Sequence, residues 1–184
     1  MAVPRFKLVQ GVSAWSSGSV VEFSSTSGSG DILGSIIGAI NFSSNAGATG
    51  PQESNAWSAT YPVLIGNNSY EFIWGLYVTS VADNGFTNMR VWAGPFTPIA
   101  GCTFYMGTDF ASGFSAPVDT NSVKATTDYS TITDQATGYI AVELIDNVIG
   151  GLSAPIWTQV RTITAAVGGN QIGMPTIGVS LDWS

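Results

Sequence analysis

Apolar residues in this chain recur at every second position, and this alternation most constrains what the chain can fold into. In residues 70–80, every even-numbered position from Tyr70 to Val78 is aromatic or aliphatic, and a similar alternation occurs in 139–146 and 176–184. Alternate side chains of a β-strand point to opposite faces, so each segment predicts a strand with one face in a core. No segment sustains the 3.6-residue period of an amphipathic helix. We therefore expect an almost wholly β protein.

The alternation also predicts which residues form the core. The expected core positions are the even-numbered residues of 70–78 together with Ile140, Val142, Leu144, Ile177, Val179 and Leu181. Further strands are expected where β-branched and apolar residues cluster, at 5–9, 20–23, 35–42, 61–65, 87–93, 103–106 and 158–164.

Turn residues separate these segments. Asn84-Gly85 accepts the positive φ angles of a tight type I′ turn, so the sequence predicts a hairpin between residues 70–80 and 87–93. Two Ser/Gly-rich stretches, residues 24–31 and 43–56, are expected to form long loops.

The length of 184 residues suits one domain, residues 1–184. The strand signals predict about eight to ten strands, which is typical of an all-β fold: an antiparallel β-sandwich or barrel with jelly-roll or immunoglobulin-like topology. The N-terminal residues MAVPRFKLVQGVSAW lack the continuous apolar run of a secretory signal, and no stretch reaches the about 18 apolar residues of a membrane span. We expect no membrane span and synthesis in the cytoplasm.

Charge and histidine content exclude several function classes. The chain has 12 acidic residues, 5 basic residues and no histidine. Five cations cannot follow a phosphate backbone, so nucleic acid is not an expected partner. Without histidine, Ser–His and Cys–His catalytic sites are impossible and the usual zinc sites lack their ligands. The single cysteine, Cys102, is interpreted as a small apolar side chain in the core.

Carboxylates leave one enzymatic alternative open. Glu71 and Glu143 lie in the middle of expected strands, where a pair of acids could serve a small glycosidase. We favour solvent-facing strand positions for both, because charged residues on sheets also prevent edge-to-edge pairing. Four other acids are too widely spaced for a calcium loop and are interpreted as turn and cap residues: Asp109, Asp119, Asp128 and Asp134.

Aromatic residues near expected loops and strand ends support a second alternative. Exposed rings can stack on sugars, so a glycan contact is possible and a carbohydrate-binding module or adhesin is the main rival function. The residues concerned are Trp15, Trp57, Tyr61, Trp92 and Trp157. The same rings could instead fill the core or subunit contacts.

Contact residues for assembly are expected in long, weakly patterned segments. Residues 1–16 carry Arg5 and Lys7, two of the 5 basic residues, and predict an assembly arm that reaches an acidic patch on a neighbouring copy. Trp15 and Trp57 are further subunit-contact candidates, because aromatic residues are enriched at the cores of interfaces. Deletion of residues 1–10 is expected to impair assembly more than folding.

Four sequence features together carry a family likeness: the N-terminus MAVPRFKLVQGVSA, Gly/Ser/Thr-rich strands, the aromatic-rich strands SYEFIWGLYVTS and NMRVWAGPF, and the final strand IGVSLDWS. In these features the chain resembles small single-domain virion structural proteins of phages and archaeal viruses, of the coat, decoration or tail type. The resemblance implies a jelly-roll or immunoglobulin-like subunit that is not an enzyme and needs no cofactor. It also implies assembly with copies of itself and with other virion proteins, and a location in the virion.

Overall fold

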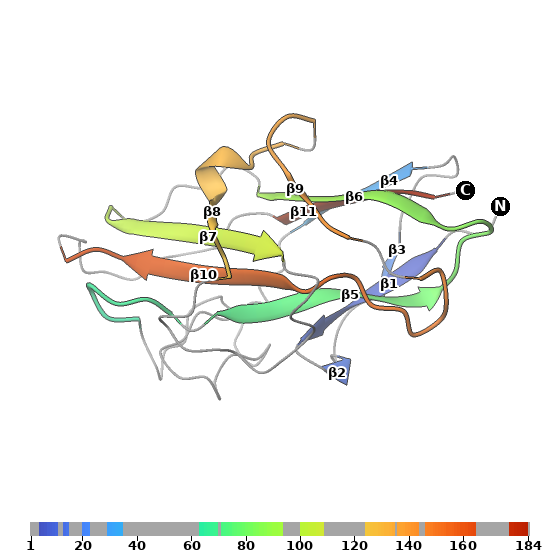
Figure 1. Cartoon of the computed structure of the whole chain (residues 1–184), viewed down its shortest axis with the longest axis horizontal. Coiled ribbons are helices and arrows are strands. Elements are labelled where there is room, and N and C mark those ends of the chain that lie inside the picture. The colour runs from blue at the N-terminus through green and yellow to red at the C-terminus, as the bar shows by residue number, and fades with distance from the viewer. Residues whose placement is uncertain are drawn as a thin grey trace.

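The computed structural model describes residues 4–10, 13–14, 20–22, 29–34, 63–69, 71–93, 100–108, 124–134, 136–143, 146–164 and 177–183. These residues form strands β1 (Arg5–Gln10), β2 (Ser13–Ala14), β3 (Val20–Glu22), β4 (Ser29–Gly34), β5 (Phe72–Ser80), β6 (Phe86–Ala93), β7 (Cys102–Thr108), β8 (Thr127–Asp128), β9 (Ile140–Ala141), β10 (Ile156–Thr162) and β11 (Ile177–Trp183) (Figure 1). One short 3-10 turn, η3 (Tyr129–Thr131), follows β8. The described residues contain no α-helix, which confirms the all-β prediction, and none of their helical segments is long and apolar enough to cross a membrane.

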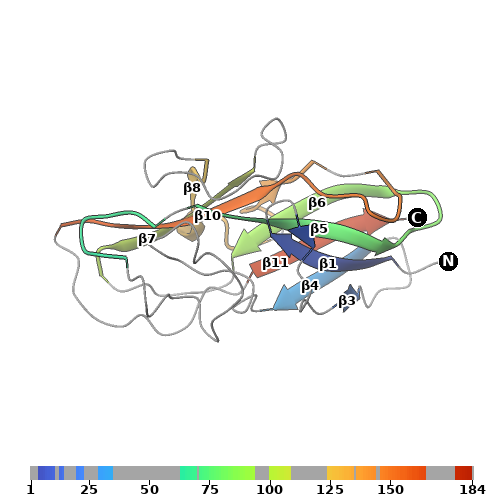
Figure 2. The ribbon, with the colours of Figure 1, turned by 90° about the horizontal axis from the view of Figure 1, so that it is seen from below.

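The strands form two antiparallel sheets. The larger sheet has the order β2-β1-β5-β10-β7-β8, with β3 also paired to β1, and the smaller sheet has the order β4-β11-β6-β9. Figure 2 shows β1, β5 and β10 as one layer and β4, β11 and β6 as another. Neither sheet closes on itself within the described residues. From β4 onward, each connection leads to the other sheet except the one from β7 to β8, which both belong to the larger sheet.

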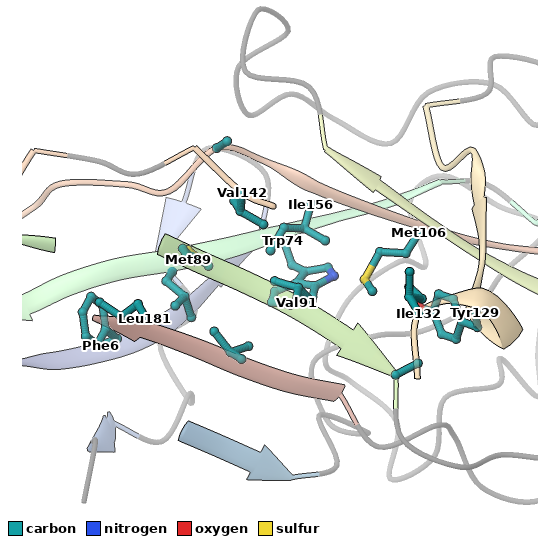
Figure 3. Close-up of a cluster of buried hydrophobic side chains, with 14 of the residues drawn as sticks. Phe6, Trp74, Met89, Val91, Met106, Tyr129, Ile132, Val142, Ile156 and Leu181 are labelled. Carbon is teal, nitrogen blue, oxygen red and sulfur yellow. The ribbon is translucent and has the colours of Figure 1, made fainter. Parts of the chain in front are cut away.

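One hydrophobic core takes side chains from both sheets, as Figure 3 shows. Trp74, Leu76 and Val78 are buried in it, which confirms the predicted inner face of residues 70–78. The other expected core residues inside the described part agree: Val142, Val179 and Leu181 are buried, and Ile140 is half-buried against the core. Tyr70 and the side chains of Phe72, Leu144 and Ile177 lie outside the described part.

The predicted hairpin at Asn84-Gly85 is wrong. β5 belongs to the larger sheet and β6 to the smaller one, so residues 81–85 connect two sheets and do not join paired strands. Gly85 does adopt the positive φ that the turn signal implied, at 131°. Asn84 does not share the positive φ that a type I′ turn requires at both central residues, so the predicted turn type is wrong as well. The pairing of each strand is decided by which partner covers its backbone edge and its apolar face.

Two further local predictions need correction. Residues 29–31, expected within a flexible loop, belong to β4, where Asp31 and Gly30 pair with Ser180 and Leu181 of β11. Of the expected strand at 61–65, residues 63–65 are described, and they are not in a strand: they enter a turn in which the Asn67 amide donates to the Leu64 carbonyl over 3.0 Å. The expected strand at 35–42 and the expected loop at 43–56 lie outside the described residues.

The N-terminal residues are part of the larger sheet. β1 pairs with β5 from Arg5 to Gln10, and Phe6 is buried in the core with its ring centroid 5.3 Å from that of Phe86. Deletion of residues 1–10 would therefore remove a paired strand and a core side chain, so it cannot separate assembly from folding as the sequence suggested. An assembly role for residues 1–16 stays a prediction.

Candidate functional site

The predicted contact residues are spread along the N-terminal third of the chain. Arg5 lies on β1 with an exposed side chain. Lys7 lies on β1 in register with Tyr77 and Val20, and its side chain is outside the described part. Trp15 and Trp57 also lie outside the described residues. All four stay predictions as subunit contacts.

The two strand glutamates differ in environment. Glu143 is exposed, as expected. Glu71 is completely buried, so its predicted position facing solvent is wrong. It lies just before β5, on the face of the larger sheet opposite Trp74, and residues 124–126 cover it there. We therefore take Glu71 and its neighbours as the candidate functional site.

The 124–126 segment is held to the larger sheet through its backbone polar groups. The Glu71 Oε1 atom accepts a hydrogen bond from the Ala125 amide over 2.8 Å and another from the Lys124 amide. The Arg161 guanidinium donates to the Ala125 carbonyl. One charged side chain just before β5 and one on β10 thus satisfy three backbone groups of this segment, including both backbone groups of the buried Ala125.

Packing brings the 124–126 segment very close to β7. A Cβ atom on Gly107 would lie 2.2 Å from the Lys124 carbonyl oxygen, so only glycine leaves room for the segment at this position. Ala125 and Trp157 are buried together here, with Tyr105 half-buried against them. This small cluster lies apart from the main core.

Aromatic rings support the two cations of the site. The Arg161 guanidinium carbon lies 3.8 Å from the Tyr105 ring centroid, and the Lys124 ammonium lies 5.9 Å from that of Trp157. Both distances fall within the range of cation–π attraction. The Arg161 Nε atom also donates to the Gln159 Oε1 atom over 2.8 Å, which fixes the plane of the guanidinium.

Burial dominates the electrostatics of Glu71. Desolvation raises the pKa of its carboxyl group, and four features partly oppose that rise: the Ala125 and Lys124 amides and the positive charges of Arg161 and Lys124. Its second oxygen, Oε2, has no hydrogen-bond partner among the described residues. The contacts of Glu71 are those of a group that holds chain segments together, and a period-two pattern could not have revealed them.

The remaining candidate residues have local structural contacts. Cys102 is half-buried against the core, and burial raises the pKa of its thiol. Asp128 accepts from the Ser130 amide at the start of η3. Asp134 accepts from the Thr137 hydroxyl and from the Thr137 and Ala136 amides, which lower its pKa. The cap and turn interpretation is confirmed for both aspartates; Asp109 and Asp119 lie outside the described part.

Two of the five rings considered for sugar binding are inaccessible. Trp157 is 1% exposed and Trp92 is 5% exposed, so neither can stack on a ligand. Gly178 makes room for Trp92, because a Cβ atom there would lie 2.1 Å from the indole. Trp15, Trp57 and Tyr61 lie outside the described residues. Within the described part, no three metal-ligating side chains of the His, Cys, Asp or Glu type gather in one place.

Comparisons with family models, with curated proteins and with solved structures found no significant match to this chain.

Proposed function

We propose that this chain is a jelly-roll β-sandwich and a non-enzymatic structural subunit of a virus particle, of the coat or capsid-decorating type, which acts by self-assembly. The order in which its strands pair carries the proposal. The composition of the chain gives further support.

The eight strands from β4 to β11 pair in a nested order. The first pairs with the last (β4 with β11), the second with the seventh (β5 with β10), the third with the sixth (β6 with β9), and the fourth with the fifth (β7 with β8). Such nesting results when one long antiparallel hairpin wraps around a core. The pairs β6–β11 and β7–β10 then join the wrapped hairpin into two sheets.

This order favours a jelly roll over an immunoglobulin-like sandwich. Immunoglobulin-type sheets join several sequence neighbours as paired strands, such as A with B and F with G. Among the described pairs formed by β4 to β11, one joins strands that are adjacent in sequence, namely β7 with β8. Two-sheet jelly rolls recur in viral capsid proteins, and they recur in lectins as well.

Composition supports assembly over sugar binding. Charged residues make up 9% of the chain and aromatic residues 11%. Interface cores are depleted in charge and enriched in aromatic residues, so a surface of this composition suits burial between copies. The buried positions of Trp92 and Trp157 weaken the rival carbohydrate-binding function.

The test is to express the full chain and examine it by sedimentation velocity and negative-stain electron microscopy, with a glycan array in parallel. We expect regular particles that contain many copies and no glycan selectivity. Asp128→Ala, which removes only a local cap, is the matched control and should assemble normally. A protein that stays monomeric at all concentrations and binds a defined glycan would overturn the proposal.

A further inference from the structure

Exposed apolar side chains of the described part gather at two opposite ends of the molecule. Leu64, Ile65 and Ile163 lie at one end, and Val148 and Ile149 lie at the other. Their exposed fractions range from 50% for Ile65 to 71% for Ile149. They are the exposed large hydrophobic side chains among the described residues, and none is on a sheet strand.

We call the first set the turn end (residues 63–67, 100–101 and 162–164) and the second the loop end (residues 81–85 and 146–151). Asn68 bridges to Arg161 beside the turn end, and the Val78 amide donates to Gly151 at the loop end. Positions 68 to 78 are about 33 Å apart at about 3.3 Å per strand residue. Figure 1 shows the segment before β5 and the segment before β10 at opposite ends of the larger sheet.

Hydrogen bonds fix the backbone of the turn end. The Thr162 hydroxyl donates to the Leu64 carbonyl over 3.0 Å or to that of Asn67 over 2.9 Å, and it accepts from the Asn67 amide. The Ile163 amide donates to the Gly101 carbonyl over 3.0 Å. Hydrogen bonds therefore link three segments of the chain at this end, residues 63–67, 100–101 and 162–164, and hold the backbone that carries the exposed apolar side chains.

The loop end is braced in the same way. The Asn147 side chain accepts from the Ala82 amide and donates to the Ala82 carbonyl, over 2.9 and 2.7 Å. The Gly150 amide donates to the Val78 carbonyl over 3.0 Å. Val148 and Ile149 therefore lie in a loop whose two ends, Asn147 and Gly150, are held by hydrogen bonds. A preorganised apolar surface loses little conformational entropy when a partner covers it.

Charge differs between the two ends. Asp83 and Asp146 are exposed at the loop end, where Arg5, paired with Ser80, offsets one of the two negative charges. The described residues of the turn end contain no charged side chain. Arg161 lies beside them, but its guanidinium is engaged with Ala125, Gln159 and Tyr105 and faces the Glu71 charge. Two loop ends brought together would place like charges face to face, whereas a turn end without charged side chains meets a loop end with no such repulsion.

We infer that the loop end of one copy docks on the turn end of the next copy, with Val148 and Ile149 against Leu64, Ile65 and Ile163. This inference rests on the proposed assembly function and names its contact. A contact between two different surfaces is heterologous, so it generates a ring where the rotation closes and a filament where it does not. Five apolar side chains are few for a standard interface of about 1,600 Å², so a single contact between two copies has low affinity. An assembly in which many copies repeat the contact is held together by their combined affinity.

The experiment uses two full-length variants that each block one end. Ile149→Asp adds a negative charge to the loop end, and Ile163→Asp adds a negative charge to the turn end, where Ile163 is 60% exposed. Ala136→Asp, at an exposed position in the turn after η3, is the matched control. Circular dichroism confirms that all three fold. Sedimentation velocity over a concentration series then reports association.

Head-to-tail docking predicts that each blocked variant alone loses self-association by about tenfold or more in apparent Kd, while the control matches wild type. An equimolar mixture of Ile149→Asp and Ile163→Asp retains one intact turn end and one intact loop end, so it should form dimers that grow no further. Self-association of either variant alone at wild-type strength, or a mixture that stays monomeric, would overturn the contact.

Micrographs separate this inference from the proposed function. If wild type and both blocked variants form the same particles, the end-to-end contact is wrong and the assembly function stands. If wild type itself forms no particles and does not self-associate, both fail.

Discussion

Replacing Glu71 with alanine tests whether the 124–126 segment is held to the larger sheet as the contacts imply. The substitution removes the acceptor of two amide hydrogen bonds, from Lys124 and Ala125, in a fully buried place. Each buried donor left without a partner costs about 1–3 kcal/mol. Removal of the carboxylate also relieves its own desolvation, so we expect a net loss of about 2–4 kcal/mol in the free energy of unfolding.

The matched variant is Glu71→Gln. Its side-chain carbonyl can still accept both amide hydrogen bonds, and the lost negative charge is one that burial already disfavours. We expect it to lose about 1 kcal/mol or less. The alanine variant should melt about 4–16 °C lower than wild type, since a domain of this size shifts by about 2–4 °C per kcal/mol.

Urea unfolding measures the free energy, and hydrogen exchange locates the effect. The Lys124 and Ala125 amides should lose protection in Glu71→Ala, whereas the Leu76 amide, which donates to the Ser153 hydroxyl inside the larger sheet, should keep it. A loss below about 1 kcal/mol with unchanged exchange at Lys124 and Ala125 would refute the reasoning.

Four other outcomes follow from the structure. Trp74→Ala should lose about 3–5 kcal/mol in urea unfolding, because Trp74 is 1% exposed within the core, and a loss below about 1 kcal/mol would place it on the surface. Gly107→Ala should lose about 1–3 kcal/mol and expose the Ala125 amide to exchange, because its Cβ would meet the Lys124 backbone; normal protection would contradict the close packing. Deletion of residues 1–10 should abolish cooperative unfolding by removing β1 and Phe6, and a folded truncated chain would show that β1 is dispensable. The pKa of Glu71 is raised above its ordinary 4.5 in the folded state, so its contribution to stability is full below that pH and is lost as pH rises through the folded pKa. The stability of wild type relative to Glu71→Gln should therefore fall as pH increases from 4 to 8, and a difference that is constant or rises with pH would contradict the raised pKa.

The period-two pattern predicted much of the core. Trp74, Leu76, Val78, Val179 and Leu181 all occupy the buried face that alternation assigned to them. Such residues are predictable because an extended strand fixes the direction of each side chain relative to its neighbours, without reference to the rest of the chain.

Pairing was not predictable in the same way. Asn84-Gly85 is a strong hairpin signal, yet β5 pairs with β1 and β10 while β6 pairs with β11 and β9. A jelly roll, as proposed here, joins strands that are far apart in sequence, so the turn between neighbours carries little information about partners. β4 shows the converse: residues 29–31 were expected in a loop, yet they belong to a strand because β11 pairs with their backbone edge.

Glu71 was assigned to the correct face of its strand but to the wrong environment. Its side chain does lie opposite the main core, where alternation placed it. The residues that bury it, Lys124 and Ala125, are 53 and 54 positions away in sequence. No short-range pattern indicates that contact. The position of Glu71 as an isolated acid beside the apolar run of β5 could have suggested that it is buried.

A cryo-electron microscopy reconstruction of the particles formed by the full chain tests the central claim most directly. We predict many copies in a regular arrangement, each with β4 beside β11 and β5 beside β10, and with the loop end of one copy against the turn end of the next. Dispersed monomers under all assembly conditions, or subunits in which β5 and β6 pair as a hairpin in one sheet, would contradict the account.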